Sequence, residues 1–247
     1  MISILEDSPN QRKERRLPSP EKFASCPYEG RILDFYQGQF DSVFVLLHPF
    51  IRCESLDPQL FYPETYPNKT EILANCASLN WKEVMDRTGL QDINAVDIGL
   101  RTGIAGLKEE FGNEEFAAAI ESFEASYPVV RPSEGKIPEL LQNTFYEALQ
   151  CTGEEWLWIA DEFDTERKLR WIDDLESEEL PWHCQLFTPD KSVQITTHWD
   201  SHFSFLCSSR ERIEEILRIH RFEGFFCDES TEVYWSLRSP VSITRVI

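Results

Sequence analysis

Side chains alternate with a period of two from Val193 to Cys207, and this is the strongest periodic pattern in the chain. Because successive side chains of a β-strand point to opposite faces, the pattern predicts one long, half-buried strand that could bend near Asp200-Ser201. The face expected to be buried carries Ile195, Trp199, Phe203 and Phe205. The face expected to be much more exposed carries His198, Asp200 and His202.

Shorter patterns predict further elements on both sides of that segment. Runs rich in β-branched and aromatic residues indicate strands at 42–47, 156–160, 182–188, 224–227 and 233–237. Apolar residues at helical spacing indicate helices at 70–78, 81–88, 93–111, 113–126, 138–152 and 209–219. Asn80 and Ser209 are expected to cap two of these helices, and Gly89 is expected to stop the first of the two. The segment 165–175 fits either a helix or a strand.

The order of these elements predicts the fold class. Helices concentrate in residues 70–152 and strands in residues 154–247, which favours an α+β fold over an alternating α/β fold. We expect a helical N-terminal and middle part packed on a C-terminal, mainly antiparallel sheet of at least four strands. Residues 1–22 are polar and contain two late prolines, so they are expected to form a flexible leader before a single α+β domain at 23–247.

Three glycines at 99, 103 and 106 invite comparison with a phosphate-binding loop. They lie within a predicted helix, without a strand-turn-helix context and without Lys-Ser or Lys-Thr after the last glycine. We therefore interpret them as places where two helices pack closely.

The charge of the chain restricts its classes of partner. The formal net charge is −20, and because the first twenty residues carry +1, residues 21–247 carry −21. Such a surface repels nucleic-acid phosphates and anionic lipids, and it favours basic partners, cations or solubility alone. No apolar run is long enough to span a membrane, and the N-terminus does not resemble a secretory signal. We therefore expect no nucleic acid and no membrane as partner.

The seven cysteines indicate the compartment. They are scattered, and none forms a Cys-x-x-Cys pair of the kind found in zinc ribbons and redox sites. Free, mostly buried thiols in a cytoplasmic protein are the simplest interpretation.

One candidate metal site follows from the long predicted strand. His198, Asp200 and His202 would project from the same face, and two imidazoles with a carboxylate can bind zinc, iron or manganese. Same-face neighbours lie about 6.6–7 Å apart along a straight strand, so a bend would be required to enclose one ion. The alternative is that these residues form the polar, solvent-facing side of the strand.

A second candidate is a protein-binding surface in the acidic segment from Glu154 to Glu179. Its acids are interleaved with the aromatic residues Trp156, Trp158, Phe163 and Trp171. Exposed aromatic side chains within an acidic surface would suit a basic protein. The residues proposed for this contact are Trp158, Asp161, Glu162 and Asp164. Alternatively, the aromatic residues belong to the core and the acids form a solvated rim.

Four blocks of sequence resemble a known family. They are Ser42 to Ile51, Asp97 to Thr102, Thr196 to Cys207, and Phe222 to Cys227 followed by Glu232 to Trp235. Together they are similar to the bacterial family called domain of unknown function 2711. The resemblance implies a single bacterial domain and supplies neither an activity nor functional residues.

Two functions of different classes therefore stay open, and catalytic residues cannot be named. The first is a non-catalytic, acidic interaction protein of the immunity type, which neutralises a basic partner and needs no cofactor. The second is a metal-dependent hydrolase that uses the His198-Asp200-His202 strand and a divalent metal such as zinc. The sequence does not indicate the oligomeric state.

Overall fold

A computed structural model describes residues 25–163, 165–234 and 236–238 of the chain. The predicted leader, residues 1–22, lies outside the described residues. Within those residues, no helix has the length and apolar character that crossing a membrane requires.

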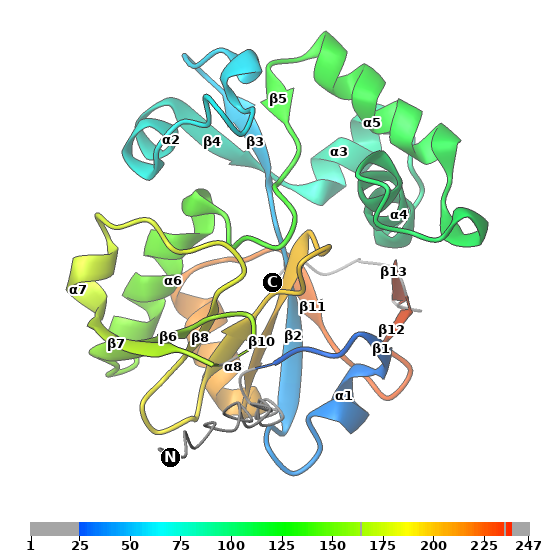
Figure 1. Ribbon diagram of the computed structural model, residues 1–247. Helices are drawn as coiled ribbons and strands as arrows, with labels where there is room; N and C mark the ends of the chain where they lie inside the picture. Colours follow the sequence, from blue (N-terminus) through cyan, green and yellow to red (C-terminus); the bar gives the residue numbers. More distant parts are fainter. Residues whose placement is uncertain (1–24, 164, 235, 239–247) are drawn as a thin grey trace, which may run out of the picture.

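A seven-stranded antiparallel sheet forms the centre of the molecule (Figure 1). Six of its strands come from the C-terminal half of the chain, which confirms the predicted α+β class and the antiparallel pairing. The seventh, β2, comes from the N-terminal part and pairs on both sides with C-terminal strands. In order across the sheet, the strands are β11 (Gly224–Phe226), β2 (Ser42–Leu47), β10 (Phe203–Ser208), β9 (Gln194–Thr196), β8 (Gln185–Phe187), β6 (Trp156–Ala160) and β7 (Arg167–Trp171).

Two three-stranded sheets flank the large one. The first contains β1 (Glu29–Arg31), β12 (Glu232–Tyr234) and β13 (Ser236–Arg238), and the second contains β4 (Cys76–Leu79), β3 (Phe50–Cys53) and β5 (Val129–Val130). The prediction of a helix over 70–78 is therefore wrong at its end, because Cys76–Leu79 forms a strand. Pairing of that segment with Phe50–Cys53 outweighs its local helical pattern.

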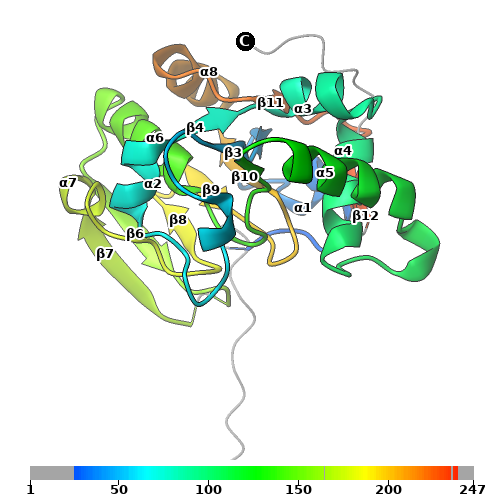
Figure 2. The same cartoon turned by 90° about the horizontal axis from the view of Figure 1, so that it is seen from above.

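Helices cover both faces of the large sheet at its β11–β2–β10 end. Strand β2 shows this most clearly: Val43, Val45 and Leu47 face one core cluster, and Phe44 and Leu46 face another. Figures 1 and 2 show α3, α4 and α5 gathered on one side and α6 and α7 on the other. The helices are α1 (Ile32–Phe35), α2 (Lys69–Asn75), α3 (Trp81–Thr88), α4 (Ile93–Gly103), α5 (Glu114–Ser126), α6 (Glu139–Cys151), α7 (Ile172–Leu175) and α8 (Arg210–Ile219), with short 3-10 turns at Pro58–Leu60 and Glu109–Phe111.

The predicted caps position two of these helices. The Asn80 side chain accepts a hydrogen bond from the Glu83 N–H at 2.7 Å, and Gly89 ends α3 in the left-handed conformation. The Glu223 carboxylate also accepts from the first two N–H groups of α3, at 2.6 and 3.0 Å, so it ties the helix to the β11 end of the sheet. Ser209 caps α8 by accepting from the Arg212 N–H at 3.2 Å.

The single long strand predicted over 193–207 is wrong. The chain reverses within residues 197–202, and β9 and β10 pair as an antiparallel hairpin in which Ile195 lies opposite Leu206 and Thr196 opposite Phe205. Phe203 and Phe205 are buried as predicted, but Trp199 is 43% exposed and His202 is fully buried. The turn interrupts the alternation, and β10 is buried on both faces, with Ser204 and Leu206 as buried as Phe203 and Phe205. The predicted division into a buried and an exposed face is therefore wrong.

Close helix packing explains Gly99. A Cβ atom at this position would lie 2.9 Å from the Phe116 carbonyl oxygen of α5, which is backbone and cannot move aside. A Cβ at Gly106 would instead meet the flexible Ile104 side chain at 3.2 Å.

We expect Gly99→Ala to lower the free energy of unfolding by about 1–3 kcal/mol, because overpacking outweighs the roughly 1 kcal/mol that alanine gains over glycine in a helix. Gly106→Ala is the matched control and should change stability by less than about 1 kcal/mol. Urea denaturation measures both. A Gly99→Ala protein as stable as the wild type would contradict the close α4–α5 approach.

Candidate functional site

The predicted metal ligands lie in the turn between β9 and β10 rather than on one strand. The turn is closed by a hydrogen bond from the Ser201 N–H to the His198 carbonyl at 2.9 Å, and the Asp200 N–H donates to Nδ1 of His198 at 3.3 Å. His202 is fully buried, whereas His198 and Asp200 are partly exposed. Among the described residues, no group of three or more His, Cys, Asp or Glu side chains is placed to hold a metal ion. The structure therefore does not assemble these three residues into a metal site.

Burial keeps the histidines of this region neutral. Desolvation lowers the pKa of His48 to about 3. Desolvation and then the Arg101 charge lower the pKa of His198 to about 4 and that of His202 well below its usual range. Neutral imidazoles can donate and accept hydrogen bonds but carry no charge at pH 7.

A chain of hydroxyl groups leads from the turn to the buried His48. The Thr197 and Ser204 hydroxyls lie 2.6 Å apart, and Ser204 Oγ lies 2.7 Å from His48 Nε2. The other ring nitrogen of His48, Nδ1, has no hydrogen-bond partner among the described residues, so the arrangement lacks the orienting group of a catalytic triad. This geometry agrees with a rigid, buried polar layer.

Arg101 and Gly135 hold the turn in place. The Arg101 guanidinium donates to Ser201 Oγ at 2.8 Å, and its Nε lies 3.4 Å from the buried Asp97 carboxylate. The Gly135 N–H donates to the Ser201 carbonyl at 2.9 Å. These contacts from two distant segments fix the position of Trp199 at the tip of the turn.

An aromatic patch lies at the other end of the sheet. Strands β6 and β7 pair so that Trp156 faces Trp171, and Trp158 faces Leu169, on the same side of the sheet. The Trp156 and Trp171 rings stack with centroids 5.8 Å apart and are 42% and 47% exposed. We call Trp156, Trp158, Leu169 and Trp171 the aromatic patch.

The sheet topology explains why this patch is open. The opposite face of β6 packs Leu157 into the core formed with α6, α7 and α8. On the patch side, the described core continues only as a small cluster in which Phe40 and Trp158 pack on Ala160 and Phe187. Strand β7 is also the last strand of the sheet, so its outer backbone edge has no strand partner among the described residues.

Acidic residues dominate the sequence segment that carries the patch, although β7 itself is basic. Residues 154–179 contain eleven acidic and three basic side chains, and the three basic ones, Arg167, Lys168 and Arg170, all lie on β7. Arg170 forms an ion pair with Glu178. A charged edge strand is a common protection against aggregation.

The four residues predicted from sequence for partner binding fall in different environments. Trp158 is partly buried and stacks on Phe187 with centroids 6.4 Å apart. Asp161 caps the β6–β7 connection by accepting from the Thr165 N–H at 2.7 Å. Burial would raise the pKa of Asp161, but the hydrogen bonds from Thr165 and from backbone N–H groups outweigh it and lower the pKa. Glu162 is partly buried, and Asp164 lies outside the described residues.

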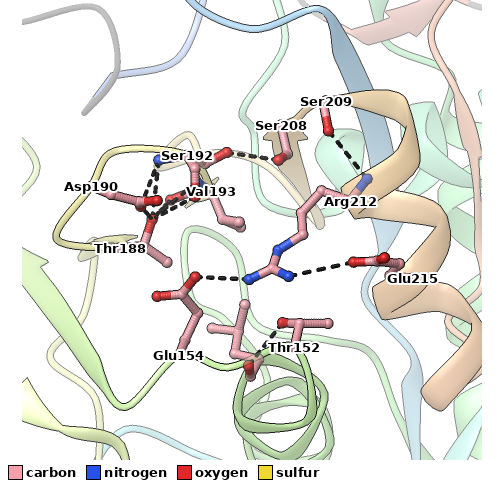
Figure 3. Close-up of polar contacts among 11 residues, drawn as sticks. Thr152, Glu154, Thr188, Asp190, Ser192, Val193, Ser208, Ser209, Arg212 and Glu215 are labelled. Atoms are coloured by element: carbon pink, nitrogen blue, oxygen red, sulfur yellow. Dashed lines mark hydrogen bonds and ion pairs between the residues drawn. The ribbon is translucent and has the colours of Figure 1, made fainter.

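A network of polar contacts anchors the start of β6, as Figure 3 shows. The Arg212 guanidinium on α8 bridges Glu154 at 2.8 Å and Glu215 at 3.4 Å, so it ties the residue two positions before Trp156 to a helix of the core. Beside it, the Ser208 hydroxyl donates to the Ser192 carbonyl at 2.6 Å. Because both carboxylates already pair with Arg212, we assign this network to positioning the aromatic patch.

A further exposed tryptophan, Trp182, already has a cation beside it. Lys136 Nζ lies 5.0 Å from the Trp182 ring and 4.6 Å from the Tyr66 ring, and it pairs with Glu139 at 2.5 Å. This cluster borders a cavity of about 570 Å³. Its aromatic faces are occupied by the protein's own lysine, which favours a structural role.

Comparison with known proteins extends over both candidate regions. A family model described as "Protein of unknown function (DUF2711)" matches residues 28–237, which include the aromatic patch and the turn at 197–202. The chain is 25% identical over 220 residues to the uncharacterised protein YwbB of Bacillus subtilis (strain 168), an alignment that covers 84% of this chain and 95% of the relative. No solved structure matches the chain. These matches confirm the resemblance that the four sequence blocks indicated.

Proposed function

We propose a function from geometry and charge, because the chain belongs to the DUF2711 family of proteins of unknown function, whose name supplies no activity. The proposed function is that of a non-catalytic, immunity-type interaction protein that binds a basic protein partner. The observation that carries the proposal is the exposed, stacked pair Trp156 and Trp171 on the edge of the sheet. Stacked indoles on a rigid scaffold are suitable anchors for a protein interface. Trp158, Asp161, Glu162 and Asp164 remain part of the proposed surface or its acidic rim.

Charge supports a basic partner over a neutral one. The net charge of −20 creates a field that accelerates encounter with a positively charged protein and weakens as salt is added. Arginine side chains of such a partner can stack on the exposed faces of the two indoles. Charge alone gives no specificity, so the aromatic anchors are needed for a stable complex.

The proposed location is the cytoplasm, where a partner-neutralising protein would act on an intracellular target. All seven cysteines are free thiols, which fits a reducing compartment. We do not propose the metal-dependent hydrolase, because His198, Asp200 and His202 do not form a group that could hold an ion.

The proposal predicts that Trp156→Ala combined with Trp171→Ala abolishes capture of a basic protein from a bacterial lysate. Loss of two such anchors should weaken binding by at least about 30-fold, while thermal stability should fall only modestly because both rings are already about half exposed. Tyr62→Ala, which removes a 62% exposed aromatic side chain outside the patch, is the matched control and should retain the partner.

Variants that replace acidic residues with neutral amides test the electrostatic contribution to partner binding separately. Glu155→Gln with Asp174→Asn should slow association with the captured protein and reduce the salt dependence of its rate, leaving dissociation almost unchanged. The captured protein must itself be basic, and it must be lost from the tryptophan variant. A partner retained by that variant, or no partner at low salt, would refute the proposal.

A further inference from the structure

A small cavity of about 240 Å³ opens between the segment that precedes β1 and the turn at 197–202. Its volume is below the roughly 300–1,000 Å³ typical of pockets for drug-sized ligands, so it suits a smaller molecule. None of the four residues of the aromatic patch is among its described lining residues, which makes it a separate site. The lining residues used below are Tyr28, Phe163, Glu162, Gln185, His198 and Trp199.

Exposed aromatic rings border this cavity. Tyr28 is 63% exposed and Phe163 51% exposed, beside the half-exposed Trp199. Tyr28 packs edge-on against His198 and Trp199, with centroid distances of 5.0 and 6.4 Å. Such a group of rings presents π-faces or ring edges to any occupant. The rings of His198 and Trp199 are held in position because Arg101 and Gly135 fix the 197–202 turn.

Two polar atoms in the wall lack partners among the described residues. Gln185 is 2% exposed, and its Oε1 accepts no hydrogen bond. Nδ1 of the neutral His198 accepts from the Asp200 N–H, so the proton of the ring belongs on Nε2, which is buried and has no acceptor. Both atoms are almost completely shielded from solvent, so they belong to the interior of the wall and an occupant of the cavity does not contact them.

The charge at the cavity is negative. Of the described lining residues, Glu162 alone carries an ionised side chain, and the protein as a whole carries −20. Arg101, which pairs with Asp97 at 3.4 Å, contributes after burial to the lowered pKa of His198, but it does not line the cavity. Aromatic faces beside a carboxylate are the usual environment for an ammonium group.

We propose that this cavity binds a small organic cation. The cation lies against the aromatic rings next to Glu162. Glu162 also belongs to the surface or acidic rim proposed for the protein partner. The cation site does not require that partner, because Trp156 and Trp171 lie outside the cavity, so either proposal can fail without the other.

Titration with choline, ethanolamine and 3,3-dimethylbutan-1-ol, the uncharged isostere of choline, tests the site in the full-length protein by NMR. We expect choline or ethanolamine to bind with Kd in the range of about 0.1–10 mM. The bound probe's protons should shift upfield because of the aromatic rings, and the Trp199 indole N–H signal should move. The uncharged isostere should bind about tenfold more weakly than choline.

Matched variants identify the residues that determine cation binding. Glu162→Gln should weaken cation binding about tenfold, whereas Glu166→Gln, a nearby exposed acid outside the cavity lining, should leave it unchanged. Tyr28→Leu should weaken binding and Tyr28→Phe should preserve it, since only the ring is required. Equal affinity for choline and its uncharged isostere, or unchanged affinity in Glu162→Gln, would overturn the assignment of a cation. Failure of both cations to bind at about 50 mM would overturn the site itself.

Discussion

Lowering the pH from about 6.5 towards 4 is expected to destabilise the protein steeply. His48, His198 and His202 are all held neutral by burial, with pKa values of about 3 for His48 and about 4 for His198, and a pKa well below the usual range for His202. In the unfolded chain each has a pKa near 6.5 and takes up a proton as the pH falls below that value. The unfolded state then binds more protons than the folded state, so stability is complete above pH 6.5 and is lost as the pH falls.

The expected effect is large. Each histidine that stays neutral in the folded protein contributes a slope approaching 1.4 kcal/mol per pH unit, so the fully buried His48 and His202 together contribute close to 3 kcal/mol per pH unit. Over two pH units this loss amounts to about 6 kcal/mol, which is at the lower end of the roughly 5–15 kcal/mol by which domains are normally stable. Glu223 and Asp200 act in the opposite direction, because burial raises their pKa values and favours the folded state at low pH.

Urea denaturation at a series of pH values between 7.5 and 4.5 measures this slope. His202→Gln isolates one histidine, and it should flatten the profile by about 1.4 kcal/mol per pH unit whatever its stability at pH 7. A His202→Gln profile parallel to that of the wild type would exclude the buried histidine as the origin.

Removing one member of the buried ion pair in α4 is expected to cost about 3–5 kcal/mol. Asp97 is fully buried and Arg101 is 3% exposed, and the Arg101 guanidinium also reaches Ser201 and lies 5.8 Å from the centroid of the Phe203 ring. Asp97→Ala leaves the arginine charge in the core without its carboxylate. The penalty is therefore mainly the desolvation of an uncompensated charge.

A double variant separates the charge effect from lost packing. Asp97→Ala with Arg101→Met removes both charges and should be more stable than Asp97→Ala alone. Glu214→Ala breaks the exposed pair between Arg210 and Glu214 on α8 and should cost less than about 0.5 kcal/mol. Midpoints of urea unfolding compare the variants. Equal costs for Asp97→Ala and Glu214→Ala would show that burial does not control the energy of the pair.

Local sequence patterns predicted the elements that are marked by a short apolar run or by a capping residue. Strands β2 and β6 follow short apolar runs, and α3 and α8 begin at Asn80 and Ser209 as expected. The reversal at 197–202 was missed because it contains neither glycine nor proline, and its stability comes from Arg101 and Gly135, which are remote in sequence. A period of two cannot distinguish one long strand from two strands of a hairpin.

The candidate surface was only partly predictable for a similar reason. The sequence indicated acids and aromatic residues between 154 and 179, but the pairing of Trp156 with Trp171 depends on the register of the β6–β7 hairpin. Which face of the β6–β7 hairpin stays exposed depends on which face of the sheet α6, α7 and α8 cover. Neither property is encoded within the segment itself, so Trp158 was favoured although the more exposed rings are its neighbours.

The position of β2 has a consequence for how the protein is made. His48, which follows β2, and Ser204 on β10 are 156 residues apart in the sequence, and both strand partners of β2 are synthesised after that interval. While the ribosome works through the middle of the chain, both edges of a strand composed of Ser, Val, Phe and Leu remain without their final partners. Pairing across such a distance also slows the last folding step. We therefore expect the nascent chain to depend on chaperones until β11 has left the ribosome, and truncations that remove β10 and β11 to aggregate rather than fold in part.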